Sequence, residues 1–160
     1  MKYTLFLQGE VNDEMVAKVQ KKLGKIDDIE AVDVLLSSPG GDPHCALAIS
    51  SLFRLSPAYI TVHAIGNVAS AAVLILAYGD KRLMAKESWV MVHEDSAELS
   101  GEVKDLERES RYLRRMENQW TALLASVTKT TAEDWTKLHK ATTYLSAAEC
   151  LKLGLIDEVV

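Results

Sequence analysis

The spacing of apolar residues changes back and forth along the first half of the chain. Residues 3–7 and 32–36 are short runs rich in β-branched and aromatic side chains, a pattern typical of strands. Between them, apolar residues recur at helical spacing over 15–23, and Gly24 is placed to stop that helix. The pattern predicts a strand, a helix and a second strand in succession.

The same succession continues as far as residue 92. Pro43 suits the first turn of a second helix, and 59–64 is the next predicted strand. Residues 70–78 are apolar on all sides, which predicts a helix inside the core. Two further strands are expected at 81–84 and 88–92. Alternating strands and helices favour a layered α/β architecture.

The second half is more charged and more helical. Residues 102–127 keep an apolar stripe at helical spacing, which predicts one long amphipathic helix. The stripe has two interpretations, a face packed on the core or a face turned toward another subunit. Ser146 and Glu149 form a capping box, and a last strand is expected at 156–159.

Composition narrows the function classes. The 160 residues contain no repeat or linker, so we expect one domain over residues 1–160. A net charge of −5 disfavours binding to nucleic acid and to anionic membrane surfaces, so neither is expected as a partner. No apolar run is long enough to span a bilayer. The absence of a signal peptide, and two cysteines without metal spacing, favour a reducing cytoplasm. No metal or organic cofactor is expected, since the four histidines lack ligand spacing.

Three segments carry candidate chemistry for acyl transfer. Ser70 lies where a strand is expected to turn into a helix, and His93 follows a separate strand. A serine with a histidine base needs backbone amides to stabilise the oxyanion, and those of Gly41 and Ala71 are the candidates. The structural alternative is a capping serine with a core histidine. The order of the Gly-Gly pair, the serine and the histidine favours the catalytic interpretation.

These motifs together resemble the Clp peptidase family of serine peptidases. The similar segments are residues 5–15, 37–41, 66–70, 90–93, 101–105, 145–149 and 154–157. The resemblance therefore covers nearly the whole chain. It implies the ClpP/crotonase-type ββα superhelical α/β fold, with a protruding long handle helix.

The resemblance also assigns roles. It implies that Ser70 is the nucleophile, that His93 is the general base, and that the amides of Gly41 and Ala71 form the oxyanion hole. The substrate is then a peptide or an unfolded protein. The helix over 102–127 corresponds to the handle through which two stacked rings of six or seven identical subunits interlock.

The sequence departs from the family at the catalytic acid. Counting back from the Leu-Ser-Ala motif without a gap, that position holds Leu138, with His139 beside it and no acid from 135 to 144. The acids that could replace the catalytic acid and orient the His93 ring are Glu94, Asp95 and Asp134, and a backbone carbonyl oxygen is the alternative partner. Asp95 points the same way along its strand as His93 but is poorly placed behind the ring.

Two other departures concern partners. Pro43 follows the Gly-Gly pair, where the family aligns a peptide as an added strand, and proline has no N–H for that pairing. His44 is either a local acid–base group or a solvated residue at a helix start. The chain begins almost at its first strand, so an ATP-driven unfoldase is not implied as a partner.

Three functions are therefore open. The first is a serine endopeptidase acting in an oligomeric ring. The second is a catalytically impaired structural or regulatory subunit, motivated by Leu138 in the acid position. The third is a crotonase-type acyl-CoA enzyme, which also uses two backbone amides, although 81–86 is only mildly basic.

Overall fold

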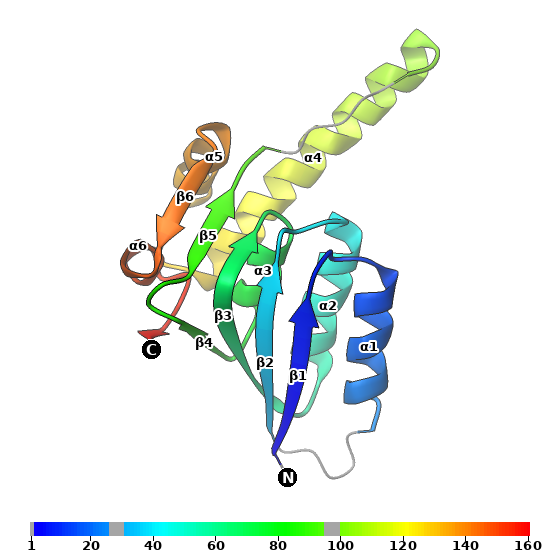
Figure 1. The fold of residues 1–160 in the computed structure, drawn as a ribbon. Helices are drawn as coiled ribbons and strands as arrows, with labels where there is room; N and C mark the ends of the chain where they lie inside the picture. Colours follow the sequence, from blue (N-terminus) through cyan, green and yellow to red (C-terminus); the bar gives the residue numbers. More distant parts are fainter. Residues whose placement is uncertain (1, 26–30, 95–99) are drawn as a thin grey trace.

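Strands and helices alternate along the first half of the chain, as the hydrophobic pattern predicts (Figure 1). The structure is a computed structural model that describes residues 2–25, 31–94 and 100–160. Its strands are β1 (Lys2–Gln8), β2 (Ala31–Ser38), β3 (Tyr59–Ala69), β4 (Lys81–Met84), β5 (Trp89–Val92), β6 (Thr143–Ser146) and β7 (Glu158–Val159). Its helices are α1 (Asp13–Leu23), α2 (Pro43–Leu55), α3 (Ala72–Ala77), α4 (Val103–Val127), α5 (Ala132–Lys140) and α6 (Ala147–Leu153).

The described strands form one sheet. β1, β2, β3, β4 and β7 are successive parallel neighbours, while β5 pairs with the far end of β3 and β6 runs antiparallel to β5. Since right-handed crossovers join β1, β2 and β3 in that order, α1 and α2 cover the same face of the sheet. Burial alternates along β2, because the side chains of Val32, Val34 and Leu36 are buried in the hydrophobic core.

Strand β3 is longer than predicted and bends before its end. Leu36 of β2 pairs with Ala64, but Ser38 pairs with Val68, so β3 holds two extra residues between these pairs. Gly66 lies in this bulge with φ +66°, a conformation that glycine adopts without steric cost. The Gly66 N–H donates to the buried Ser88 hydroxyl at 2.8 Å. The bulge re-aims the last residues of β3 toward β5.

The apolar segment after β3 is shorter as a helix than the sequence predicts. Residues 70–78 were expected to be helical, but α3 covers only Ala72–Ala77. The expectation of complete burial is confirmed, because each of its six residues is buried. Ser70 and Ala71 are instead the turn between β3 and α3.

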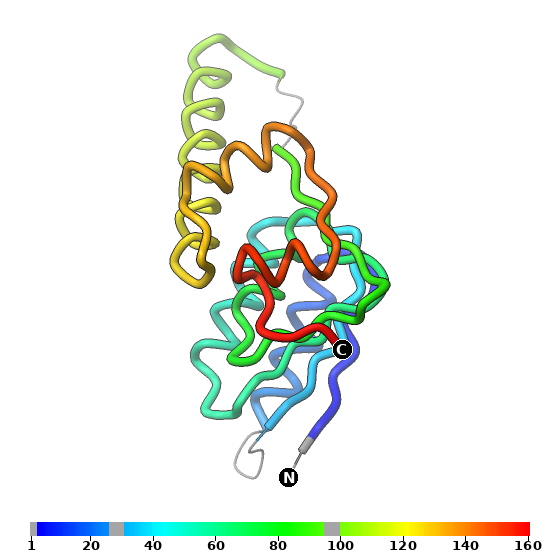
Figure 2. The backbone as a smooth tube through the Cα atoms, turned by 90° about the vertical axis from the view of Figure 1, so that its left-hand side faces the viewer, coloured from blue at the N-terminus to red at the C-terminus, as the bar shows by residue number. Residues whose placement is uncertain are grey.

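Helix α4 projects from the body, as Figures 1 and 2 show from two directions. The prediction of a long helix over 102–127 is confirmed, with Glu102 as its N-cap. At 1.5 Å per residue its 25 residues extend about 37 Å. Its buried residues, Thr121 and Leu124, both lie in its last two turns. The N-terminal turns are thus not held by core packing within one chain.

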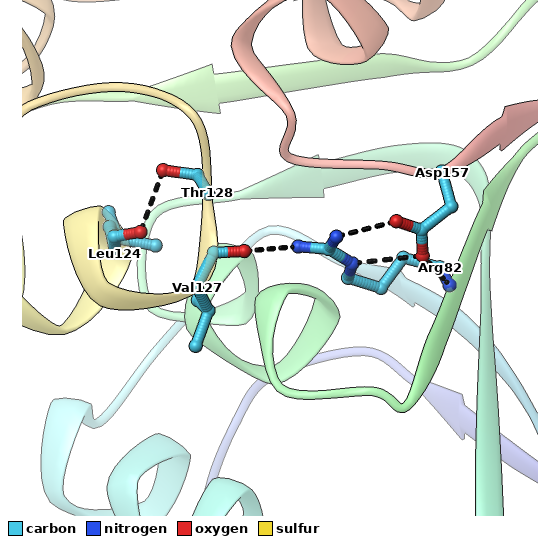
Figure 3. A network of polar contacts seen from close by, with 5 residues as sticks. All are labelled: Arg82, Leu124, Val127, Thr128 and Asp157. Atoms are coloured by element: carbon cyan, nitrogen blue, oxygen red, sulfur yellow. Dashed lines mark hydrogen bonds and ion pairs between the residues drawn. The ribbon is translucent and has the colours of Figure 1, made fainter.

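An arginine anchors the base of α4 (Figure 3). The Arg82 guanidinium donates to both carboxylate oxygens of Asp157, at 2.6 and 3.1 Å, and to the Val127 carbonyl oxygen at 2.7 Å. Burial raises the pKa of the Asp157 carboxyl, but the hydrogen bonds and charge of Arg82 outweigh this and lower the pKa below its usual value. Arg82 therefore joins the end of α4 to the sheet and to the C-terminal segment.

The last elements follow local capping signals. The Ser146–Glu149 capping box opens α6, and Gly154 ends it in the left-handed conformation at φ +74°. The predicted strand at 156–159 forms only over Glu158–Val159. β6 was not predicted from the pattern, because four residues with one buried side chain give too short a signal.

Candidate active site

Ser70 and His93 meet at the ends of two neighbouring strands. β3 and β5 are parallel, with Ala69 opposite Met91, so the residues that follow both strands emerge at the same edge. The Ser70 N–H continues this pairing by donating to the Met91 carbonyl oxygen at 2.8 Å. The Ser70 Oγ and the His93 Nε2 are 2.9 Å apart. This distance allows the imidazole to accept the hydroxyl proton.

The backbone of Ser70 is strained. Its φ of +52° lies in the left-handed region, which non-glycine residues rarely adopt. Strained backbone of this kind is found at functional sites, where the surroundings hold it. Here the surroundings are the hydrogen bond to Met91 and the start of α3. The turn projects the Ser70 side chain out of the sheet edge, toward His93.

The Gly-Gly pair packs directly against this turn. A Cβ atom on Gly40 would lie 2.7 Å from the Ser70 Cβ and 2.8 Å from the Ala69 carbonyl oxygen. On the other side, the Val11 N–H donates to the Gly40 carbonyl oxygen, and the Asp42 N–H donates to that of Val11. Glycine is needed at position 40, with φ +97°, because both the contact and the conformation exclude a side chain.

Two backbone amides near Ser70 are available to a ligand. The bridge between Val11 and Gly41 uses the N–H groups of Val11 and Asp42, so the Gly41 N–H points away from this pairing. The Ala71 N–H lies in the turn before α3, where first-turn amides have no helical partner. Among the hydrogen bonds of the described residues, neither amide is used as a donor.

A cavity of about 580 Å³ opens beside Ser70 and His93. Pro43 and Ala71 line it on the side of the serine. The opposite wall comes from α4 and α5, which contribute Glu117, Trp120 and His139 among others. The His139 Nδ1 lies 2.7 Å from the Trp135 carbonyl oxygen, so that nitrogen carries a proton. The size and the mixed polar lining suit a peptide segment more than a small apolar ligand.

No acidic side chain of the described residues is hydrogen-bonded to the His93 imidazole to orient it. Val92 pairs with Thr143 in the antiparallel β5–β6 pairing, and one further step of this register brings Thr142 opposite His93. Leu138, which the ungapped count placed at the acid position, packs instead against the hydrophobic core and does not line the cavity. Counting back from the Leu-Ser-Ala motif did not point to Thr142, because the pairing of β6 with β5 is evident only in the folded chain.

Thr142 itself is a second strained residue. Its φ is +50°, an unfavourable conformation for a β-branched side chain. The Thr142 N–H donates to the His139 carbonyl oxygen at 3.0 Å, which closes the turn after α5. Sequence reasoning did not single out Thr142, because its place relative to His93 follows from the β5–β6 register, which local spacing does not show.

The three substitute acids have different positions. Asp134 lies in the first turn of α5, which Thr131 caps: its carboxylate accepts from the Thr131 hydroxyl at 2.8 Å and lies 3.5 Å from the Lys137 ammonium. The hydrogen bond from Thr131 lowers the pKa of Asp134. Asp134 does not line the cavity, whereas Glu94 is exposed on its rim. Asp95 lies outside the described residues.

The structure gives no support for a cysteine nucleophile or a metal site among the described residues. Burial raises the pKa of the Cys150 thiol to about 12 and also raises that of Cys45, so neither thiol is activated as a nucleophile. Within the described ranges, no group of three or more histidine, cysteine or acidic side chains is arranged to hold a metal ion. No helix in those ranges is long and apolar enough to cross a membrane.

Comparison with known sequences gives one family over the full length. The sequence model described as "Clp protease" matches residues 1–160. ATP-dependent Clp protease proteolytic subunit 3 of Rhodococcus jostii is 29% identical over 162 residues, which cover 98% of this chain and 80% of the relative. Subunit 2 of Treponema denticola is 28% identical over 160 residues, with 97% and 80% covered.

Comparison with solved structures identifies the fold. A point mutant of ClpP1 from Listeria monocytogenes superposes with a TM-score of 0.89 over 98% of this chain and 90% of that one. The sequences are 23% identical, so this likeness bears on the fold alone. The expected α/β fold of the ClpP type, with its protruding helix α4, is confirmed.

Proposed function

Because the chain belongs to the Clp protease family, we propose that it is a serine endopeptidase that cleaves peptides or unfolded proteins through an acyl-enzyme on Ser70. The observation that carries the proposal is the 2.9 Å separation of the Ser70 Oγ and the His93 Nε2. A capping serine does not need an imidazole acceptor, whereas a nucleophilic serine does.

The reaction begins when a peptide carbonyl carbon approaches Ser70 from the cavity. The Ser70 Oγ forms a bond to that carbon while the His93 Nε2 takes the hydroxyl proton. The carbonyl oxygen becomes negative and accepts hydrogen bonds from the N–H groups of Gly41 and Ala71. His93 then returns the proton to the leaving amine, and the acyl group remains on Ser70.

Water completes the cycle on the same groups. His93 takes a proton from a water molecule, and the resulting hydroxide attacks the acyl carbon. The two amides stabilise the second oxyanion, and the proton on His93 returns to the Ser70 oxygen. The carboxylic acid leaves, and the enzyme is restored. One domain over residues 1–160 supplies every group in this sequence of steps.

The proposal includes assembly into rings. The N-terminal turns of α4 project beyond the body and include exposed apolar residues, Val103 at 71% and Tyr112 at 46% exposure. These turns have no core packing within one chain, and the resemblance of α4 to the handle of the family implies that they pack against another subunit. Native mass spectrometry of the purified protein tests the assembly directly, and a monomer at micromolar concentration would contradict it.

An impaired subunit is the second candidate, and a specific observation favours it. No carboxylate of the described residues is hydrogen-bonded to His93, and extending the β5–β6 register by one residue gives Thr142, which is not an acid. Without an acid the imidazole tautomer is not held, and such a loss costs about 10⁴-fold in turnover in a serine protease. An assembled protein without a reactive serine would support this candidate.

Fluorophosphonate labelling separates the two candidates. The Ser70 Oγ displaces fluoride from phosphorus only when a base activates it, and intact mass reports the adduct. We expect stoichiometric labelling of the wild type and none of Ser70→Ala. Ser51→Ala, an exposed serine on α2, is the matched control and should label fully. An assembled, folded wild type that remains unlabelled would favour the impaired subunit.

A further inference from the structure

The start of α2 is joined to α4 by an aromatic contact. The His44 and Tyr112 rings are stacked, with centroids 6.3 Å apart and planes at 15°. The Tyr112 Oη and the His44 Nε2 are 3.1 Å apart, within hydrogen-bond distance. The two residues are 68 positions apart in the chain, so only the fold brings them together. Neither residue takes part in the proposed proton transfers.

This contact lies at the edge of the cavity and connects two of its walls. Pro43, directly before His44, lines the cavity on the side of the serine. Arg114 and Glu117, within the next turn and a half after Tyr112, line it from α4. The distance between the walls therefore depends on how α4 is held against α2.

Core packing does not hold this part of α4. The buried residues of the helix are Thr121 and Leu124, more than two turns after Tyr112. Tyr112 itself is 46% exposed, and the ring contact that the structure gives it is with His44. The stacked and hydrogen-bonded pair therefore fixes the distance between α2 and this part of α4, which core packing does not fix.

A short, stiff segment links His44 to the Gly41 amide. The Asp42 carboxylate accepts from the N–H groups of His44, at 2.7 Å, and Cys45, at 3.4 Å. Pro43 has a fixed φ, and Gly41 is paired with Val11. A displacement of His44 is therefore transmitted along the backbone to Gly41 rather than absorbed between them.

We infer that His44 and Tyr112 are positioning residues, whose contact holds α4 against the start of α2 and so fixes the Gly41 N–H for the developing oxyanion. This inference rests on the proposed function. It predicts that the contact affects the transition state more than substrate binding, because the oxyanion forms only during the reaction. Loss of the contact should thus lower kcat with little change in KM.

The test is a double-mutant cycle read by the rate of Ser70 phosphonylation, a reaction that also places negative charge in the oxyanion site. Tyr112→Phe keeps the stacked ring and removes the hydroxyl, and His44→Ala removes the partner. We expect each variant to slow labelling roughly threefold, and the double variant to be no slower than His44→Ala. His44→Gln, whose amide end lies near the place of Nε2, should restore most of the rate.

A control variant and two contrary results separate the positioning role from the proposed function. Tyr59→Phe, on an equally exposed tyrosine at the start of β3, should label at the wild-type rate. Additive losses, or wild-type rates in Tyr112→Phe and His44→Ala, would overturn the positioning role alone. An unlabelled wild type would overturn the proposed function and this inference with it. Peptide turnover with the same variants then checks the split between kcat and KM.

Discussion

The serine side and the histidine side of the site are held very differently. Ser70 is fixed by a backbone hydrogen bond to Met91 and by Gly40, which leaves no room for a side chain beside it. Among the described residues, the only hydrogen-bond partner of the His93 ring is the Ser70 hydroxyl. The proposed nucleophile is therefore positioned by backbone packing, whereas no acid of the described residues orients the proposed base.

This difference indicates which parts of such a site tolerate substitution. Backbone packing at Gly40 cannot be altered without moving the serine, because the contacts involve main-chain atoms on both sides. A side-chain partner of a histidine is replaceable one residue at a time. A fold of this kind can thus lack an orienting acid and still hold the proposed nucleophile and the two amides in place.

The largest expected effect is on the serine side. Gly40→Ala places a methyl group 2.7 Å from the Ser70 Cβ at a φ of +97°, so the serine turn must shift. We expect phosphonylation to fall at least about 100-fold and stability to fall by roughly 2–4 kcal/mol. Labelling kinetics and urea unfolding measure the two effects.

The control for this substitution isolates the packing. Gly9→Ala also introduces a side chain at positive φ, +85°, but into open space. We expect it to cost only about 1 kcal/mol, with labelling unchanged. Equal losses of labelling in both variants would show that backbone conformation alone, rather than the contact with Ser70, explains the effect.

The next effect is a gain on the histidine side. Thr142→Asp places a carboxylate opposite His93, at a left-handed position that aspartate tolerates better than threonine. A carboxylate there would hold the imidazole tautomer and stabilise the imidazolium. We expect peptide turnover to rise about tenfold or more, below the roughly 10⁴-fold limit set by complete loss of an acid.

Two variants make that prediction specific. Thr142→Asn relieves the same backbone strain without a charge, so its turnover should stay near that of the wild type. Leu138→Asp puts the charge at the position from the ungapped count, where the side chain packs on the core. It should destabilise the protein by roughly 2 kcal/mol without a gain in turnover. A gain in Leu138→Asp but not in Thr142→Asp would refute the register argument.

The smallest effect lies away from both sides, at the base of α4. Asp157→Asn weakens the ion pair with Arg82, and we expect a loss of about 1 kcal/mol at pH 7, since the carboxylate is partly exposed. The pKa of Asp157 is lowered in the folded state, so its stabilisation is present above the unfolded pKa, about 3.9.

The pH dependence checks the sign of this effect. The stabilisation by Asp157 is lost as the pH falls through the lowered folded-state pKa. The difference in stability between the wild type and Asp157→Asn should therefore shrink in acid, as measured by urea unfolding between pH 7 and pH 2. A difference that grew on acidification would show that the carboxylate is not stabilised by Arg82.

Much of the fold and part of the site were predictable from local signals. Helical spacing over 102–127 and the Ser146–Glu149 box predicted α4 and the start of α6, because periodicity and caps involve residues close in the chain. Ser70 and His93 were candidates for the same reason, since each follows a recognisable strand. The two candidate residues could therefore be named without the structure, which adds the 2.9 Å separation of their side chains.

The tertiary structure decided what depends on pairing between distant segments. The bulge that lengthens β3 is set by its neighbour β2, and the position of Thr142 opposite His93 is set by the β5–β6 register. The contact between His44 and Tyr112 likewise spans 68 positions. Such pairings depend on how the whole sheet and α4 pack, which no local spacing encodes. The candidate nucleophile, by contrast, could be identified from the residues directly around it in the sequence.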